Sequence, residues 1–290
     1  MKFSNAIRLG IAAAMAAALA HAQAPNRSPV SKIYVADTEG ESQVDVGKKI
    51  SVLAKKAVYK GEGAAIETKP TSNASIVLSN GIGIYFDVAT RVRIRGFAQA
   101  PFRPTGADMD DEPSISRTDM AIDYGVVGVS TSKMAAGSTL LFDSPLATAD
   151  LHGRQAVFQV GDTVAKISML LGGATVRAGA FDAGRELKEG QQVIIHAGRP
   201  GQPNEVLVQD IPEGRQEGQR EWLAERVLAA DSARKLVYFE MQVVNESGER
   251  VSVFGGESPP GTHLEIQPVP VVPSNPPVQP TVSAANLSSP

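Results

Sequence analysis

The residue types that most often carry out chemistry are few and widely spaced in this sequence. Cysteine is absent, which excludes a cysteine nucleophile, thiolate metal ligands and disulfide bonds. Beyond residue 22 the histidines are His152, His196 and His263, and none has the H-x-x-x-H or H-E-x-x-H spacing of a zinc site. The chain also contains no G-x-S-x-G nucleophile motif and no phosphate-binding loop. We therefore expect no catalytic residue, no metal and no cofactor.

One group of acidic residues could attract a cation. It consists of Asp108, Asp110, Asp111 and Glu112. Its spacing lacks the glycine turn and the distal glutamate of a calcium-binding loop, so we interpret it as a solvated loop. Carboxylates can also meet only in the folded protein, as the pair in a glycoside hydrolase does. The alternative function is therefore an envelope polysaccharide-active enzyme, or a glycan-binding module, on a β-solenoid.

A short basic stripe is the other candidate site. Arg91, Arg93 and Arg95 alternate with Val92 and Ile94, which places all three arginines on one face of a strand. Such a face either binds an anion or is simply solvated, and we favour the solvated face. The remaining lysines and arginines are scattered, and the chain has 28 basic against 31 acidic residues. A nucleic-acid partner needs a clustered basic surface, so we expect none.

The N-terminus has the pattern of a secretory signal peptide over residues 1–22. Lys2 and Arg8 precede the apolar run Leu9–Ala20, and small residues occupy the two positions that a signal peptidase requires to be narrow. Cleavage after Ala22 is favoured, with Ala24 as the second choice. The run is too short to span a membrane. We expect a periplasmic or secreted protein with no stable membrane insertion after cleavage.

Short alternating strands dominate the chain from residue 45 to 212, which predicts an all-β fold. From Ile82 to Val88 every second residue is apolar, and this period of two is typical of a strand. Similar runs predict strands at Ile122–Val129, Thr139–Phe142, Ala156–Val160, Ala174–Val176, Val193–Ile195 and Val206–Val208. Gly81 and Gly153 are expected to be structural turns, where glycine tolerates positive φ.

The strands also repeat as a larger unit, in which a glycine-led strand is followed by a turn, a second glycine and another strand. Three copies cover residues 60–94, 125–153 and 172–195. Each unit leaves an apolar face for its neighbour to cover. This repetition predicts a short-strand β-solenoid or a sandwich-like domain, and the sequence leaves both open.

These phrases resemble the FecR-like periplasmic domain family. The similarity lies in Ile66-Glu67-Thr68, in the strand and turn of residues 74–81, in Thr90–Ile94, and in residues 137–153. Together the similar phrases extend over residues 45 to 197. The resemblance implies a non-enzymatic domain that binds, signals or serves as a scaffold in the bacterial envelope, with an envelope protein or peptide as its partner.

The sequence departs from the family in two ways. Arg154 stands where the family usually has a threonine after the glycine. Membrane-bound FecR regulators also carry a cytoplasmic segment and a transmembrane helix ahead of this domain, whereas here a signal peptide leads into it. A direct anti-sigma role in the cytoplasm is therefore not expected.

The remaining segments complete the predicted organisation. Residues 23–44 are expected to be a linker, and residues 213–256 a helix followed by a β-hairpin. The helix is predicted over Glu213–Arg234, with acidic residues towards its start and basic residues towards its end. The hairpin is predicted to pair Leu236–Val244 with Arg250–Phe254. Prolines crowd residues 257–290, which we interpret as a disordered tail.

Overall fold

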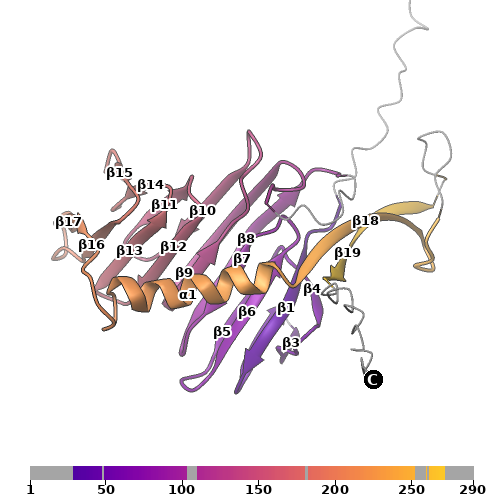
Figure 1. The fold of residues 1–290 in the computed structure, drawn as a ribbon, viewed down its shortest axis with the longest axis horizontal. Helices are drawn as coiled ribbons and strands as arrows, with labels where there is room; N and C mark the ends of the chain where they lie inside the picture. The colour runs from indigo at the N-terminus through magenta and orange to yellow at the C-terminus, as the bar shows by residue number, and fades with distance from the viewer. Residues whose placement is uncertain are drawn as a thin grey trace, which may run out of the picture.

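A computed structural model of the chain describes residues 29–47, 49–102, 110–179, 182–251, 259 and 261–271. The predicted signal peptide with its predicted cleavage residues Ala22 and Ala24, Asp108 and residues 272–290 of the predicted tail lie outside the described residues. The described chain is mostly β-structure with one helix, which confirms the predicted all-β class (Figure 1).

Strands β1 to β17 form two sheets that face each other and are joined through β9, and β18 and β19 form a separate two-stranded sheet. One sheet is covered by the helix on its outer side, and we call it the helix-covered sheet. In spatial order it contains β4 (Val58–Lys60), β1 (Lys32–Glu39), β6 (Asn73–Leu78), β7 (Gly83–Phe86), the end of β9 (Ser116–Ser130), β12 (Gln155–Val160), β13 (Val164–Leu171), β16 (Gln191–His196) and β17 (Glu205–Asp210).

No helix of the described residues lies on the outer side of the other sheet, which we call the open sheet (Figure 1). In spatial order it contains β3 (Lys49–Val52), β2 (Ser42–Val46), β5 (Ala64–Thr68), β8 (Arg91–Gln99), the beginning of β9, β10 (Thr139–Asp143), β11 (Thr148–Leu151), β14 (Ala174–Arg177) and β15 (Arg185–Leu187). The β9–β10 pair is parallel, and the other pairs in both sheets are antiparallel.

Strand β9 belongs to both sheets. Its residues up to Tyr124 pair with β8, and its residues from Gly125 onwards pair with β7 and β12. The change occurs at Gly125, where φ is +101° and a β-carbon would overlap Thr90. Only glycine fits this combination of positive φ and close approach, so Gly125 allows one strand to join the two sheets.

A single apolar core fills the space between the sheets. Inward residues of both sheets contribute to it, including Phe142 of β10 and Phe158 of β12, whose ring centroids are 4.5 Å apart. This contact crosses from one sheet to the other. Burial of such alternating side chains is the main source of stability in a chain without disulfides.

The predicted repeat corresponds to hairpins that alternate between the sheets. From residue 139 onwards, successive hairpins join alternate sheets. Hairpins β10–β11 and β14–β15 belong to the open sheet, and hairpins β12–β13 and β16–β17 belong to the helix-covered sheet. The hairpins advance along the long axis of the molecule (Figure 1). The structure therefore combines two facing sheets, as in a sandwich, with the stepwise progression that the repeats indicated.

The two predicted turn glycines are needed for different reasons. Gly81 has φ of +87°, and its N–H bonds the carbonyl of Leu78, as expected for a turn. Gly153 does not have positive φ, which corrects that part of the prediction. Instead, a β-carbon on Gly153 would lie 2.7 Å from the carbonyl oxygen of Leu171. Two connections between the sheets cross at this point, and glycine lets their backbones touch.

The turn at Gly81 is buried. The side-chain amide of Asn80 donates to Ser116 Oγ (2.9 Å) and Thr118 Oγ1 (3.2 Å), and Ser79 Oγ donates to Gln99 Oε1 (2.8 Å). All five side chains are at most 2% exposed. These hydrogen bonds satisfy the Asn80 amide nitrogen and the Ser79 hydroxyl, whereas Asn80 Oδ1 is buried without a hydrogen-bond partner among the described residues.

The predicted linker at residues 23–44 is wrong for its second half. β1 is a full partner of β4 and β6, and β2 pairs with β3 and β5. The run from Ile33 to Ala36 is buried on both faces, because Ile33 and Val35 enter the main core while Tyr34 and Ala36 pack on the outer side. A strand buried on both faces shows no alternation, so the period of two could not reveal it.

The C-terminal region needs two further corrections. Helix α1 spans Arg220–Arg234 and starts later than predicted, because Gly214 and Gly218 adopt positive φ before it. Strand β18 (Val237–Asn245) pairs along its whole length with β19 (Thr262–Pro270), a partner that was not predicted. The start of the predicted hairpin is present, because Arg250 bridges to Val244 and the Val251 N–H donates to the Val243 carbonyl, whereas residues 252–254 lie outside the described chain.

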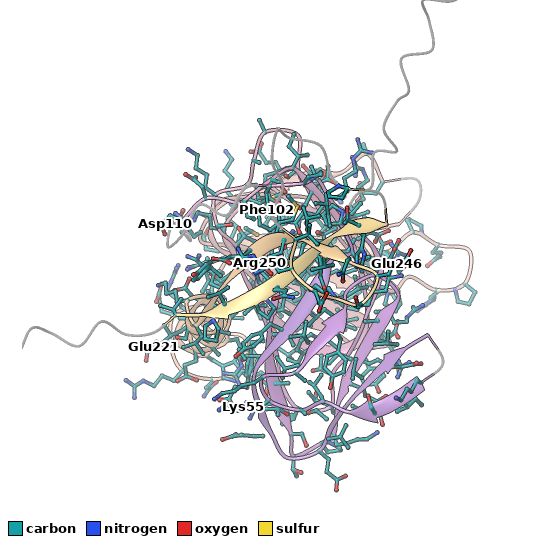
Figure 2. The ribbon with its side chains drawn as sticks, turned by 90° about the vertical axis from the view of Figure 1, so that its right-hand side faces the viewer. Lys55, Phe102, Asp110, Glu221, Glu246 and Arg250 are labelled. Carbon is teal, nitrogen blue, oxygen red and sulfur yellow. The ribbon has the colours of Figure 1, made fainter. Side chains whose placement is uncertain are left out.

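Strand β19 lies within the segment predicted to be a disordered tail. Its Ile266 is buried against Val237 and Phe239 of β18. Glu265 of β19 also bridges to Val30, but the two prolines follow at positions 268 and 270, where β18 is the paired strand, and proline is tolerated at such an edge. Figure 2 shows the β18–β19 ribbon crossing in front of the sheets when the molecule is viewed along α1. Within the described residues, no helix is long and apolar enough to cross a membrane.

Candidate binding surface

The histidines do not come together. His152 follows β11, His196 ends β16 and His263 lies in β19, and all three are exposed. His152 Nε2 lies 3.0 Å from Thr175 Oγ1. Among the residues that the structure describes, no group of three or more His, Asp or Glu side chains could hold a metal ion.

The acidic cluster is tied into the backbone of a neighbouring segment. Lys133 N–H donates to the Asp110 carbonyl (2.7 Å), and Glu112 N–H donates to the Lys133 carbonyl (2.9 Å). The Glu112 carboxylate accepts hydrogen bonds from Ser116 Oγ and from the Ala135 N–H. This carboxylate closes a loop, and so it acts as a structural acceptor.

The arginine stripe lies on the outer face of the open sheet, where carboxylates on neighbouring strands neutralise it. Arg91 pairs with Glu67 of β5 (2.7 Å), and Arg93 pairs with Asp123 of β9 (2.6 Å). Arg95 contacts Asp119 and Asp143. We call this set the charge ladder. It is a solvated strand face with balanced charge, and it offers no net positive potential to an anion.

The ladder also sets one carboxyl pKa. A hydrogen bond from Lys69 Nζ lowers the pKa of Glu67 below its ordinary value of 4.5. Burial opposes this shift, and hydrogen bonds from Arg91 and Gln43 support it. Glu67 is therefore held in its charged form by the cations on either side of it.

The outer face of the helix-covered sheet is different, because α1 lies directly on its backbone. A β-carbon on Gly83 would overlap the carbonyl oxygen of Ala230, and one on Gly128 would lie 2.6 Å from the carbonyl oxygen of Arg226. The two glycines are on the adjacent strands β7 and β9. They form a flat strip on which the helix can approach more closely than any side chain would allow.

A partly buried ion pair fixes the middle of the helix. Arg226 Nε and Nη2 each lie 2.9 Å from Asp87 Oδ2, and both side chains are largely buried. The Arg226 guanidinium also lies 3.6 Å from the centroid of the Trp222 ring one helical turn earlier. The guanidinium thus joins the end of β7 to the helix while stacking on an aromatic face.

Apolar contacts hold the helix on either side of this pair. Leu223 and Val227 pack with Val157 and Ile211, and Ala233 packs with Tyr34 and Val77 in a second cluster. Asp231 accepts a hydrogen bond from Ser130 Oγ (3.0 Å). The apolar stripe of the helix was predictable as a packing face, but the glycine strip that receives it was not predicted from the sequence. The available signal was the pair of glycines inside the apolar runs Ile82–Ile84 and Val127–Val129, because an isolated glycine in a strand often marks a close approach.

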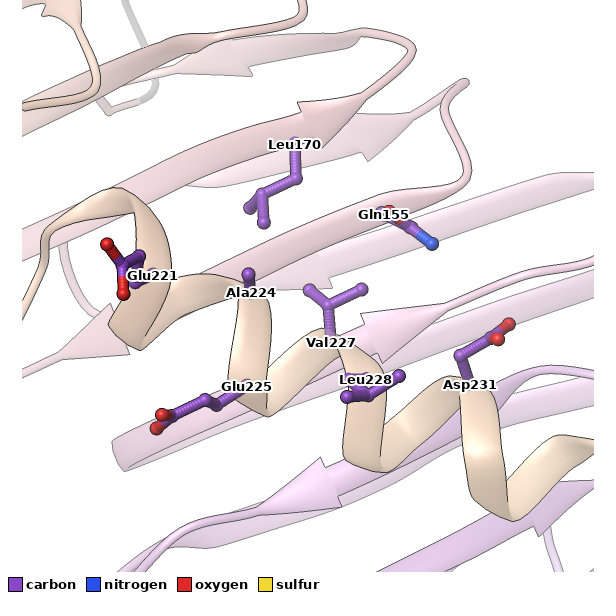
Figure 3. Close-up of a pocket in the computed structure, with 8 residues that line it drawn as sticks. All are labelled: Gln155, Leu170, Glu221, Ala224, Glu225, Val227, Leu228 and Asp231. Carbon is purple, nitrogen blue, oxygen red and sulfur yellow. The ribbon is translucent and has the colours of Figure 1, made fainter. Parts of the chain in front are cut away.

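A groove of about 430 Å³ runs along one side of the docked helix (Figure 3). Its apolar part is formed by Leu170 of β13 together with Ala224, Val227 and Leu228 of α1. Leu228 is 63% exposed, which is unusual for a leucine in the middle of a docked helix. Figure 3 shows Leu170 and Gln155 on the strands, facing the helix across this groove.

Carboxylates surround the apolar part of the groove. Glu221 and Glu225 lie on the helix towards one end, and Asp231 lies towards the other (Figure 3). Burial raises the pKa of Asp231, but hydrogen bonds from Lys235, Arg234 and Ser130 outweigh burial and lower the pKa overall. Asp231 is therefore charged near neutral pH, and the groove combines an apolar floor with an acidic rim.

The similarity of this chain to known proteins is remote. No protein-family model matches the chain, and no curated protein matches it. Two crystal structures of a "putative anti-sigma factor" from Parabacteroides distasonis are similar at 15% identity with a TM-score of 0.36. The alignment covers 50% of this chain and 59% of that chain, so it spans less than two thirds of the compared protein.

Proposed function

We propose that this chain is an exported, FecR-like protein of the bacterial envelope that binds a partner protein without acting as an enzyme. The observation that carries the proposal is the groove beside α1. Its floor exposes Leu228 on a rigid, docked helix, and its rim carries the carboxylates of Glu221, Glu225 and Asp231. The complementary ligand is a protein segment with an apolar face and flanking lysines or arginines.

The rigidity of the groove supports a binding role. Backbone contacts at Gly83 and Gly128 and the Arg226–Asp87 pair fix the helix against the sheet. A partner therefore meets a surface that is already formed and does not have to order it, which lowers the entropic cost of association. The exposed apolar side chain at the centre of such a surface is the expected anchor point.

The alternative of a polysaccharide-active enzyme has less support at this groove. Each rim carboxylate faces a cation: Glu221 pairs with Arg215, Glu225 with Arg226, and Asp231 with Arg234 and Lys235. A general acid in glycoside hydrolysis needs a raised pKa, whereas that of Asp231 is lowered. Loss of a measurable turnover in Asp231→Asn, with the fold intact, would favour the enzyme instead.

Site-specific photo-crosslinking in cells tests the binding role. A photoreactive amino acid replaces Leu228 in the groove, and in a matched control it replaces Ile50, which is equally exposed (64%) but lies on β3 of the open sheet. We expect a discrete protein adduct from position 228 and none from position 50. Adding Glu221→Lys and Glu225→Lys should reduce that adduct at least about tenfold, since both changes reverse rim charges. Equal adducts at both positions would contradict the proposal.

Export is tested by the mature N-terminus. We expect mass spectrometry of the protein from a periplasmic or culture fraction to show a chain that begins at Gln23, after cleavage behind Ala22. Ala22→Asp should block this cleavage, because the peptidase requires a small residue there. A chain that keeps Met1 and stays in the cytoplasm would contradict the assignment.

A further inference from the structure

The two facing sheets have four edge strands, β4, β17, β3 and β15. These strands differ in how well they are protected against pairing with a strand of another chain. Open edges expose unpaired backbone N–H and C=O groups, and proteins usually guard them with very short strands, lysines or prolines. β4 and β15 are three residues long, and β3 has four residues beginning with Lys49. β17 has six residues, Glu205–Asp210, with neither lysine nor proline. It is the least protected of these four edge strands.

The register of β17 shows which of its groups are available. β17 pairs with β16 over all six residues, and Ile211 N–H donates to the Gly190 carbonyl in the same ladder. Because backbone groups alternate along a strand, Gln209, Leu207 and Glu205 also point towards β16. Val206, Val208 and Asp210 therefore direct their N–H and C=O groups away from the sheet. Figure 1 shows β17 at the outer margin of the molecule.

The side chains of this edge are apolar in the middle and acidic at both ends. Leu207 and Val208 are partly exposed, at 51% and 37%. Glu205 and Asp210 form no ion pair with any residue that the structure describes. If two copies paired antiparallel about Val208, Asp210 of one would face Val206 of the other, and neither Glu205 nor Asp210 would gain a cationic partner. A segment with a basic residue at each end supplies the opposite charges that a second copy lacks.

We propose that β17 is a β-augmentation site for an extended partner segment with lysine or arginine at each end and alternating apolar residues between. The segment adds as a further antiparallel strand beside β17, where backbone hydrogen bonds supply affinity and the terminal charges supply specificity. This inference deepens the proposed protein-binding function and rests on it. It concerns a different element from the groove, so the two can fail separately.

The test uses the purified mature protein and a fluorescent eight-residue probe with lysine at both ends and alternating valine and threonine between. The key variant is Val208→Pro, which removes an outward N–H but no bond to β16, since proline is tolerated on an edge with its nitrogen facing solvent. Val208→Ile keeps the N–H and is the matched control. We expect Val208→Pro to weaken probe binding at least about tenfold and Val208→Ile to leave it unchanged.

A charge-reversal pair provides the second measurement. Glu205→Lys with Asp210→Lys should switch preference from the lysine-ended probe to the same peptide ended by glutamates. This result is informative even if Val208→Pro does not fold. The proposal is overturned if the lysine-ended probe fails to bind, binds Val208→Pro equally well, or shows no preference over the glutamate-ended peptide. The groove variants Glu221→Lys and Glu225→Lys should leave probe binding unchanged, which separates this inference from the proposed function.

Discussion

The outer faces of the two sheets differ in what covers them: charged side chains and water cover one, and a helix covers the other. The open sheet covers its outer face with charged side chains, and the charge ladder of Arg91, Arg93 and Arg95 stays in water. The helix-covered sheet has no side chain at Gly83 and Gly128, and α1 buries the outer face of the sheet there. In this protein, two glycines on neighbouring strands mark the face on which a third layer docks, whereas alternating charges mark the face that stays in water.

The largest expected effect on stability comes from adding a side chain at Gly83 or Gly128, where α1 lies on the sheet. Gly128→Ala or Gly83→Ala places a β-carbon against a helix carbonyl oxygen, so α1 must lift from the sheet. We expect each to lower the free energy of unfolding by about 3 kcal/mol, at the upper end of the usual cost of overpacking. Denaturant unfolding monitored by the fluorescence of Trp222, the single tryptophan, measures this loss.

The matched control for that prediction is Gly96→Ala on the open sheet. A β-carbon there would lie 3.6 Å from Asp119 Cβ, which is an ordinary contact, and φ is not positive. We expect a change below about 0.5 kcal/mol, as for most surface substitutions. Equal losses at Gly96 and Gly128 would show that the close approach of the helix is not what makes glycine necessary.

An intermediate effect is expected from the ion pairs. Asp87→Asn removes the partner of a largely buried Arg226 (16% exposed), and we expect a loss of about 2 kcal/mol, as for hydrogen bonds to charged groups. Asp123→Asn in the charge ladder should cost less than about 1 kcal/mol, because Arg93 is half exposed. Thermal unfolding of the two variants side by side measures the difference, and a reversed order would contradict the contrast between the faces.

The smallest expected effect is on pH dependence. The folded pKa values of Glu67 and Asp231 are both lowered, so each contributes stability above its unfolded pKa and loses it as pH falls through the folded pKa. We expect the free energy of unfolding to fall on acidification below about pH 4.5. Asp231→Asn and Glu67→Gln should each make that decline shallower. A steeper decline in either variant would contradict the direction of its pKa shift.

Much of the β-structure could be predicted from the sequence. Where one face of a strand meets the core and the other meets water, the period of two is visible, and strands such as β7, β10 and β16 lie where that period predicts them. β1 was missed because both of its faces are buried. β19 was missed because prolines usually signal a loop, and only its pairing with β18 shows that they lie on an edge.

The candidate site was much less predictable. The absence of catalytic spacing followed from the residues themselves, and so did the placement of the arginine stripe on one strand face. The neutralising carboxylates could not be predicted, because Glu67, Asp123 and Asp143 come from three other strands. Likewise, Asp87 and Arg226 are 139 residues apart, and nothing local indicates that they meet.

By itself, the sequence determined the strand-forming pattern and the turn at Gly81, because each depends on residues that are neighbours in the chain. The tertiary structure alone decided which sheet each hairpin joins, which face α1 covers and which edge remains open. Those outcomes depend on contacts between distant segments, such as Gly128 against Arg226 and β17 at the end of its sheet. Loop closure and close packing, which no local pattern records, select among the arrangements that the strands permit.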